Sequence, residues 1–244
     1  MINRKVVILV MSSSNNSYKK LEESIKETWF NSRDNDVEII FYSDNDNEIN
    51  KVEYPILRGN NLILPCNDGY FNLGIKTIMA FDWVSKNYKY DYIYRSNLGA
   101  FINVKNLLSF LVNKPKNKFY SGIIGKCKIS LDKEIIFASG SGYLLSNDVI
   151  NIILDNKNKW DHNIVDDVAL GELLSNLQIN LDKSARRLSY CDDEIYYQIG
   201  ESDVNEIVDD EIYHIRLRSN ERVKDINNMH HLWEKLKKNN NNNR

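Results

Sequence analysis

The sequence is poor in residues that interrupt, bend or cross-link a chain. Its 244 residues include 3 prolines, 10 glycines and 3 cysteines. The prolines and glycines do not gather into a linker, so we expect one domain rather than two. Cys66, Cys127 and Cys191 are widely spaced and form no CxxC pair, which is typical of buried, reduced thiols and not of a disulfide framework.

Long apolar runs and a strong charge bias are missing as well. The apolar stretch Val6–Met11 is too short to span a bilayer and lacks the small-residue cleavage site of a signal peptide. We therefore predict a cytoplasmic protein without a membrane span, which suits a bacterial or viral pathway. The net charge of -2 argues against a nucleic-acid partner.

Several common ligand-binding motifs are also absent. The chain contains neither a GxxxxGK[ST] phosphate loop nor a GxGxxG after its first apolar run, which disfavours nucleoside triphosphatases and dinucleotide-binding enzymes. His162, His230 and His231 have no cysteine or carboxylate at ligand-like spacing, so no zinc site is assigned.

Apolar runs and amphipathic segments alternate along the first half of the chain. Val6–Val10 and Val37–Tyr42 are continuous apolar runs, typical of strands buried on both faces, and the segment between them has apolar residues at helical spacing as far as Trp29. Further helices are predicted over 73–87, 104–112, 148–154 and 166–177, and short strands over 92–94, 119–124, 127–130 and 134–137.

This alternation predicts an α/β fold with a mostly parallel central sheet, helices on both faces and a mixed second half. We assign residues 1–236 to one domain. Residues 237–244 are two lysines, five asparagines and an arginine, a tail that is predicted to be disordered. Ligands of open α/β sheets bind at the carboxyl ends of parallel strands, so loops 12–17 and 43–47 and the segment after Tyr94 should border one crevice.

Five segments resemble, in order, motifs of the β1,3-glycosyltransferase family, family 31, of which Fringe is a close relative. They are Ser24–Trp29, Asp68–Thr77, Tyr92–Asn103, Gly140–Ser146 and Asp166–Gly171. The first is similar to the family's aIRxTW, the second to DxYxNLTxKT, the fourth to GxGYvlS and the fifth to EDVxxG. The resemblance implies the GT-A nucleotide-sugar fold.

The third motif departs from the family pattern. The family binds a divalent metal there with an acidic triplet, and the metal holds the donor diphosphate. The corresponding positions are Asn97, Leu98 and Gly99, whereas a hard cation prefers carboxylate oxygens. A metal such as Mn²⁺ is therefore disfavoured. Arginines could stabilise the diphosphate instead, because the guanidinium fork matches phosphate.

The resemblance also implies roles for single residues. Asp167 is the expected catalytic base, with Asp166 beside it; two carboxylates at a helix start could equally serve as caps. The predicted donor-binding residues are Ser12, Asp68, Lys76, Arg95, Asn97, Gly99, His214, Arg216 and Arg218. The predicted acceptor-binding residues are Gly140, Ser141 and Gly142.

Several of these residues could instead have purely structural roles. Arg216 and Arg218 could alternate outward on an edge strand, and Lys76 could be a solvated lysine on a helix. Gly140 and Gly142 could serve a bulge or a tight turn rather than the approach of a sugar.

We predict an inverting glycosyltransferase that moves a sugar from a nucleoside-diphosphate donor, UDP-linked by resemblance, to a hydroxyl of a glycan or protein acceptor. It would be metal-independent or weakly metal-dependent. The alternative is an inactive GT-A module that binds carbohydrate or nucleotide. Convergence of Asp167 and an arginine on one crevice favours catalysis, and their separation favours binding alone.

Overall fold

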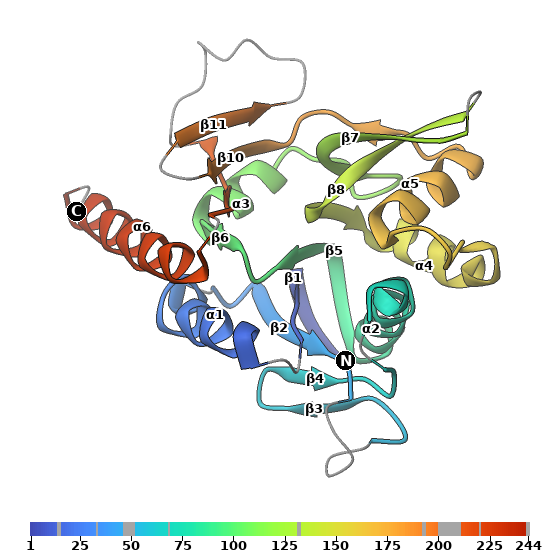
Figure 1. The fold of residues 1–244 in the computed structure, drawn as a ribbon, viewed down its shortest axis with the longest axis horizontal. Coiled ribbons are helices and arrows are strands. Elements are labelled where there is room, and N and C mark those ends of the chain that lie inside the picture. Colours follow the sequence, from blue (N-terminus) through green and yellow to red (C-terminus); the bar gives the residue numbers. More distant parts are fainter. Residues whose placement is uncertain are drawn as a thin grey trace.

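Two sheets and the helices around them make up the described part of the chain (Figure 1). The computed structural model describes residues 1–13, 16–32, 34–45, 52–67, 69–130, 133–191, 194–199, 211–219 and 221–242. The strands are β1 (Ile2–Met11), β2 (Val37–Ser43), β3 (Ile56–Arg58), β4 (Asn61–Ile63), β5 (Tyr88–Asn97), β6 (Ala100–Ile102), β7 (Tyr120–Ser130), β8 (Lys133–Ser146), β9 (Leu181–Asp182), β10 (Arg186–Cys191), β11 (Glu194–Ile199) and β12 (His214–Leu217). The helices are α1 (Asn16–Glu27), α2 (Leu73–Asn87), α3 (Val104–Leu111), α4 (Asn147–Asp155), α5 (Asp166–Asn176) and α6 (Arg222–Asn242), with short 3-10 helices η1 (Trp29–Ser32), η2 (Tyr70–Asn72) and η3 (Lys157–Lys159).

The large sheet has the order β3-β4-β2-β1-β5-β8-β7-β9. Its centre is parallel, since β1 pairs with β2 on one side and with β5 on the other. The continuous apolar run Val6–Val10 lies in β1 and is completely buried, as expected for a central strand covered on both faces. From β5 onward the pairing with β8 and β7 is antiparallel, so the predicted change from parallel to mixed is confirmed.

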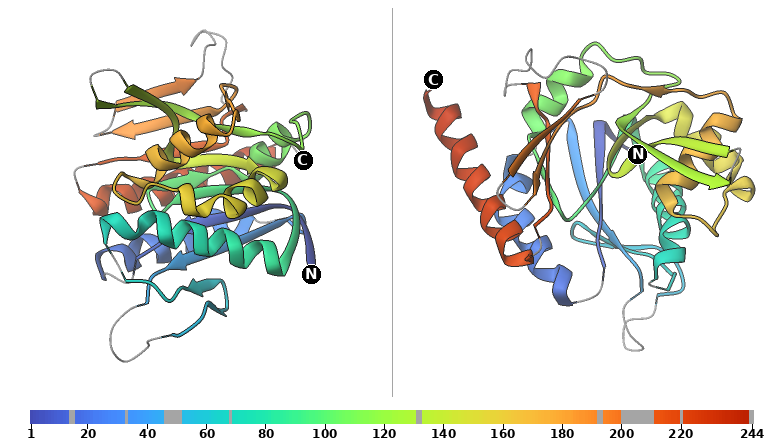
Figure 2. Two further views of the ribbon diagram at one scale, coloured as in Figure 1. Left: turned by 90° about the vertical axis from the view of Figure 1, so that its right-hand side faces the viewer. Right: turned by 45° about the horizontal axis from the view of Figure 1, so that its top comes forward.

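Helices cover both faces of this sheet, and alternate residues of β1 enter two separate cores. Val7 and Leu9 pack in a cluster with side chains of α2, α4 and α5. Val6, Ile8 and Val10 pack on the opposite face with α1, α3 and α6. The right-hand view in Figure 2 shows α1 and α6 side by side on one flank and α2 on the other. The predicted GT-A-type layering is therefore present.

The segment after Pro115 differs from the prediction. Three short strands were expected, whereas β7 and β8 form one long antiparallel hairpin with register shifts between Gly122 and Ile124 and between Lys128 and Ser130. Such shifts interrupt the apolar–polar alternation, so a continuous strand looks like separate pieces in the sequence.

The small sheet has the order β11-β10-β12-β6. β12, which carries Arg216, pairs in parallel with β10 and antiparallel with β6. It is an interior strand, so the edge-strand interpretation of Arg216 and Arg218 was wrong. Strand order depends on long-range pairing, which local alternation does not show.

Two smaller predictions also need correction. Helix α6 continues to Asn242, well into the segment that composition predicted to be disordered. The helix already packs on α1, and lengthening an existing helix adds one backbone hydrogen bond for each residue that becomes ordered. Cys66 and Cys127 are free thiols, as predicted, but both are only partly buried. The side chain of Cys191 lies outside the described residues.

Candidate active site

A cavity of about 520 Å³ lies at the carboxyl ends of the central parallel strands. Met11 and Ser12, at the end of β1, form part of its wall together with the turn Asn97–Gly99, which follows β5. The N-terminal end of α2 and the segment 216–218 complete it. This is the position that the sheet topology predicts for a ligand.

Six of the predicted donor-binding residues line this one cavity. They are Ser12, Lys76, Asn97, Gly99, Arg216 and Arg218. Arg222, which belongs to the same basic C-terminal segment as Arg216 and Arg218, also lines the cavity. Two tyrosines of the wall, Tyr18 and Tyr70, were not predicted. Tyr70 lies within the second family-like motif, which was the available signal. Asp68 lies outside the described residues.

The turn that replaces the acidic triplet is a compact connection between β5 and β6. The Asn97 side chain accepts a hydrogen bond from the Gly99 amide at 3.0 Å. The Leu217 amide donates to the Gly99 carbonyl at 2.7 Å, which fastens the end of β12 to this turn. Leu217 is buried and lines the cavity together with its two neighbours, Arg216 and Arg218.

Lys76 is buried and is not a solvated lysine on the surface of a helix. Its side chain is 3% exposed, and its ammonium lies 3.2 Å from an Asp44 carboxylate oxygen and 3.2 Å from the Ser12 carbonyl. These contacts join α2 to the ends of β1 and β2. Lys76 therefore fixes the cavity floor and places one paired positive charge there.

The remaining charges around the cavity are those of arginines. Arg218 is exposed, and Arg222 donates to the buried Asp225 carboxylate at 3.0 Å while its guanidinium carbon lies 6.0 Å from the centre of the Tyr18 ring. Arg216 precedes both on the chain and also lines the cavity. The cavity thus presents guanidinium groups to any anion that enters it.

The described residues around the cavity do not fit a divalent metal. Within the described ranges, no group of three or more histidine, cysteine or carboxylate side chains is placed to hold one. His214 is fully buried, and its Nδ1 lies 2.5 Å from the Tyr94 hydroxyl. Burial, followed by the charges of Arg187 and Arg216, holds the pKa of His214 well below its usual range. A cationic setting of this kind opposes a hard cation.

Arg95 was predicted to contact the donor, but it lies in the protein interior instead. Its guanidinium forms a buried ion pair with Asp166 at 2.6 Å and also donates to the Tyr42 hydroxyl at 3.2 Å. Both partners of the ion pair are at most 5% exposed. Asp166 is therefore committed to joining α5 to β5, because removing either charge would leave the other buried.

Asp167 sits beside this pair at the start of α5. Its carboxylate accepts hydrogen bonds from the Gly140 amide at 2.6 Å and the Val168 amide at 3.0 Å. Burial, and then the charge of Asp166, raise the pKa of the Asp167 carboxyl. A Cβ at Gly140 would lie 3.0 Å from the Asp167 carboxylate, so this glycine allows the close approach.

Ser141 and Gly142 lie against a third group of side chains. A Cβ at Gly142 would lie 2.8 Å from the His214 ring, and the Ser141 hydroxyl accepts a hydrogen bond from Arg187. Arg187 is 3% exposed, and burial followed by the charge of Arg216 lowers its pKa to about 10. Arg187 was not predicted, since it lies in no family-like motif.

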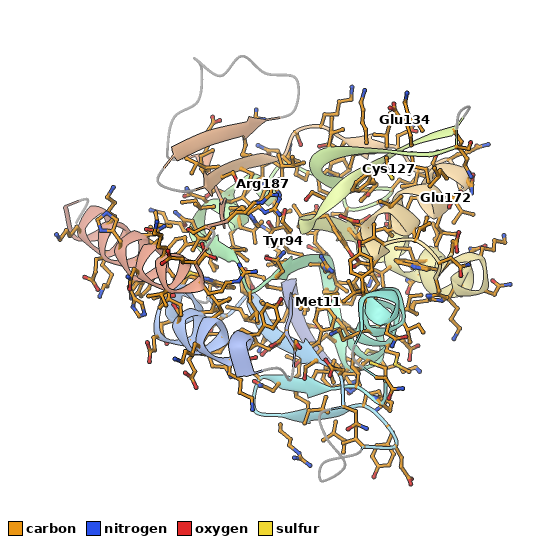
Figure 3. All side chains as sticks on the ribbon, in the orientation of Figure 1. Met11, Tyr94, Cys127, Glu134, Glu172 and Arg187 are labelled. Atoms are coloured by element: carbon orange, nitrogen blue, oxygen red, sulfur yellow. The ribbon has the colours of Figure 1, made fainter. Side chains whose placement is uncertain are left out.

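The cavity lies close to the buried group of Arg95, Asp166 and Asp167 and to the group around Ser141 and Gly142. Figure 3 shows Met11, Tyr94 and Arg187 near the middle of the molecule, between the large and the small sheet. Arg95 lies 3.3 Å from the Met11 sulfur, and Met11 lines the cavity. Arg216 both lines the cavity and influences the pKa of Arg187. However, neither Asp166 nor Asp167 is among the described residues that line the cavity.

The arrangement of the two sheets and their covering helices is that of a GT-A-type fold. A solved structure titled as a glycosyltransferase involved in the glycosylation of the major capsid of PBCV-1 superimposes with a TM-score of 0.51, over 93% of this chain and 98% of that one, at 10% sequence identity. At that identity the likeness shows the fold alone.

Sequence comparison then confirms the resemblance to the β1,3-galactosyltransferase group. A family profile described as Galactosyltransferase matches residues 21–134. Beta-1,3-galactosyltransferase 5 of Pan paniscus is 27% identical over 134 residues, 48% of this chain and 44% of that protein. UDP-GalNAc:beta-1,3-N-acetylgalactosaminyltransferase 1 of Homo sapiens is 31% identical over 134 residues, 47% of this chain and 40% of that protein.

These matches cover less than half the length of the relatives and less than half of this chain. The family profile includes the motif Ser24–Trp29 and the turn Asn97–Gly99, but it ends before Asp167. No helix in the part of the chain that the structure describes is long and apolar enough to cross a membrane.

Proposed function

We propose that this chain transfers a sugar from a nucleoside-diphosphate donor to an acceptor hydroxyl, with the donor diphosphate bound in the 520 Å³ cavity. The observation that carries the proposal is the convergence of Arg216, Arg218 and Arg222 on the turn that replaces the family's metal-binding triplet. Guanidinium groups at this position can stabilise the negative charge that develops on the leaving diphosphate.

A second cavity supports an elongated donor. It has a volume of about 350 Å³, shares Ser12 and Ser13 with the first, and reaches Asp44 and Asn61 beyond the end of β2. A nucleoside in this second cavity and a diphosphate in the first would place both parts of a nucleotide along the carboxyl ends of the strands. The relatives named for UDP-GalNAc make UDP the first nucleotide to test.

Asp167 is the candidate base. In the proposed step, the acceptor oxygen forms a bond to the anomeric carbon while the bond from that carbon to the diphosphate oxygen breaks. The acceptor proton passes to the Asp167 carboxylate, and the electron pair leaves with the diphosphate. Attack on the side opposite to the leaving group would invert the anomeric centre. A raised pKa suits a group that accepts this proton.

One observation favours the second candidate function, a binding module without transfer. Asp166 is held in a buried ion pair, and within the described residues Asp167 does not line the large cavity. A chain that kept only the cationic cavity would bind a nucleotide or nucleotide sugar without activating an acceptor.

Release of UDP from UDP-galactose and UDP-N-acetylgalactosamine, with simple saccharide acceptors, separates the two functions. If transfer occurs, Asp167→Asn should lose at least about 100-fold in rate, the usual contribution of a general base, while UDP binding stays unchanged. Glu172→Gln is the matched control, because Glu172 lies on the same helix, pairs with Lys133 and does not line the cavity. UDP binding without any acceptor-dependent release would contradict the transferase and support the binding module.

A further inference from the structure

A third cavity lies apart from the candidate active site. It has a volume of about 330 Å³ and shares no lining residue with the other two. Its walls come from the second half of α3 and the turn after it, the start of β10, and Glu211. Because α3 and β10 belong to opposite halves of the sequence, the cavity exists only in the folded chain.

The cavity wall carries hydrogen-bond donors and acceptors together. Lys114 and Arg186 supply positively charged donors, Glu211 supplies a carboxylate, and Asn113 supplies an amide that can do both. The ring of Phe110 adds an apolar surface, and it packs 4.8 Å from the ring of Tyr213. Mixed polar groups around an aromatic ring match a polyhydroxylated molecule, since each sugar hydroxyl both donates and accepts while its C–H groups are apolar.

The two cationic side chains are held in place by one residue. The Lys114 ammonium donates to the Ser184 hydroxyl at 2.8 Å, and Arg186 donates to the Ser184 carbonyl at 3.1 Å. The ammonium also lies 4.3 Å from the centre of the Phe110 ring, and Glu211 lies 3.5 Å from the Arg186 guanidinium. Side chains that are already fixed lose less conformational freedom when a ligand binds.

Two cations, Lys114 and Arg186, and one carboxylate, Glu211, line this cavity, and Asp182 supplies a second carboxylate close to its wall. Asp182, which accepts hydrogen bonds from Ser184, interacts with Lys114 as well. Burial, opposed by Asp182 and reinforced by Arg186, lowers the pKa of the Lys114 ammonium. Carboxylates and cations are balanced here, unlike in the arginine-rich cavity at the strand ends. This balance favours a neutral polar ligand over a phosphate or a nucleotide.

We propose that this third cavity is an accessory saccharide-binding site, which takes one neutral sugar unit between Lys114, Arg186 and Glu211 with its apolar side toward Phe110. It does not depend on the proposed transferase activity. A glycan bound here would be held by the chain at a point separate from the donor cavity.

Saturation-transfer NMR with galactose, N-acetylglucosamine and lactose tests the site directly in the full chain. Sugar binding should weaken at least about fivefold in Lys114→Met, in Arg186→Met and in Asn113→Ala. The Asn113 side chain is exposed, so Asn113→Ala should fold normally. Lys116→Met is the matched control for Lys114→Met, because Lys116 is 67% exposed and pairs with Asp91 outside the cavity. UDP binding, measured on the same samples, should not change in any of these variants.

The results that would overturn the proposal are specific. No saturation transfer from any of the three sugars would do so, and so would equal transfer in wild type, Arg186→Met and Asn113→Ala. Binding of sulfate or glucuronate without any neutral sugar would show a simple anion site instead. If the wild-type chain binds a neutral sugar but does not bind UDP, the proposed function is contradicted and the saccharide site is still supported.

Discussion

Arg95 and Arg218 both lie near the carboxyl ends of the large sheet, yet their surroundings differ completely. Arg95 is buried against the Asp166 carboxylate, with hydrogen bonds to β2 and β8. Arg218 is exposed at the edge of a cavity in which other arginines are its neighbours. The difference shows that residue type near a predicted site does not define a ligand contact. A buried arginine that already has a carboxylate holds the fold together, whereas arginines collected around a cavity are placed for an anion.

The largest expected effect comes from breaking the buried pair. Asp166→Ala should lower the free energy of unfolding by about 3–5 kcal/mol, because it leaves the Arg95 charge buried and unpaired. The double variant Arg95→Met/Asp166→Leu should recover much of the loss, since it removes both charges. Urea denaturation measures both. A single variant within about 1 kcal/mol of wild type would show that the pair is not structural.

The close packing around Gly142 should make this position sensitive to an added methyl group. Gly142→Ala should lower the free energy of unfolding by about 1–3 kcal/mol, because the added methyl group would meet the His214 ring. Gly59→Asn is the control, since nothing lies within 4 Å of a Cβ there and asparagine tolerates its positive φ. Equal stability of the two variants would mean that β8 moves away from His214 without cost.

The cavity arginines should respond in the opposite way to Arg95. Arg218→Ala should weaken UDP binding by about 10–100-fold, the loss expected for one charged hydrogen bond, while stability changes by less than about 0.5 kcal/mol. Arg4→Ala is the matched control, because Arg4 forms a surface ion pair with Glu38 far from the cavity. Calorimetry and denaturation on the same samples give both quantities. If Arg218→Ala lowers the stability without weakening UDP binding, Arg218 has a structural role like that of Arg95.

The smallest effect concerns Asp167 and its titration. Its pKa is raised in the folded chain, so the protonated folded state is favoured below the unfolded pKa, and that stabilisation is lost as pH rises through the folded pKa. Asp167→Asn should remove this decline. Stability curves of wild type and variant between pH 3 and pH 7, roughly the range in which carboxyls titrate, provide the measurement. Parallel curves would show that the carboxylate keeps an ordinary pKa.

The elements were predictable where the pattern was local. The buried run Val6–Val10 and the apolar face of α2 specify a central strand and a covering helix without further information. The position of Ser12 after the first strand predicted its place at the cavity, and the family-like motifs added Lys76 and Gly99. Long-range geometry was not available, because β12 became an interior strand through pairing with β6 and β10.

The site residues illustrate the same limit. Arg95 lies two residues before the replaced triplet, but its guanidinium pairs with the buried Asp166 carboxylate, and Arg95 is not among the described residues that line the cavity. Arg187 lies in no motif, and the fold alone brings it to Ser141. A sequence pattern predicts which side chains share one face of a helix or strand, whereas the tertiary fold determines which residues contact that face.

The most direct test of the central claim is calorimetric binding of UDP to the wild-type chain, first with EDTA and then with Mn²⁺. If arginines serve in place of a metal, the dissociation constant should be the same under both conditions and should fall with decreasing salt, as expected for charged contacts. Binding that requires Mn²⁺ and disappears in EDTA would contradict the account, because the diphosphate would then depend on a cation that the residues at Asn97–Gly99 are not suited to hold.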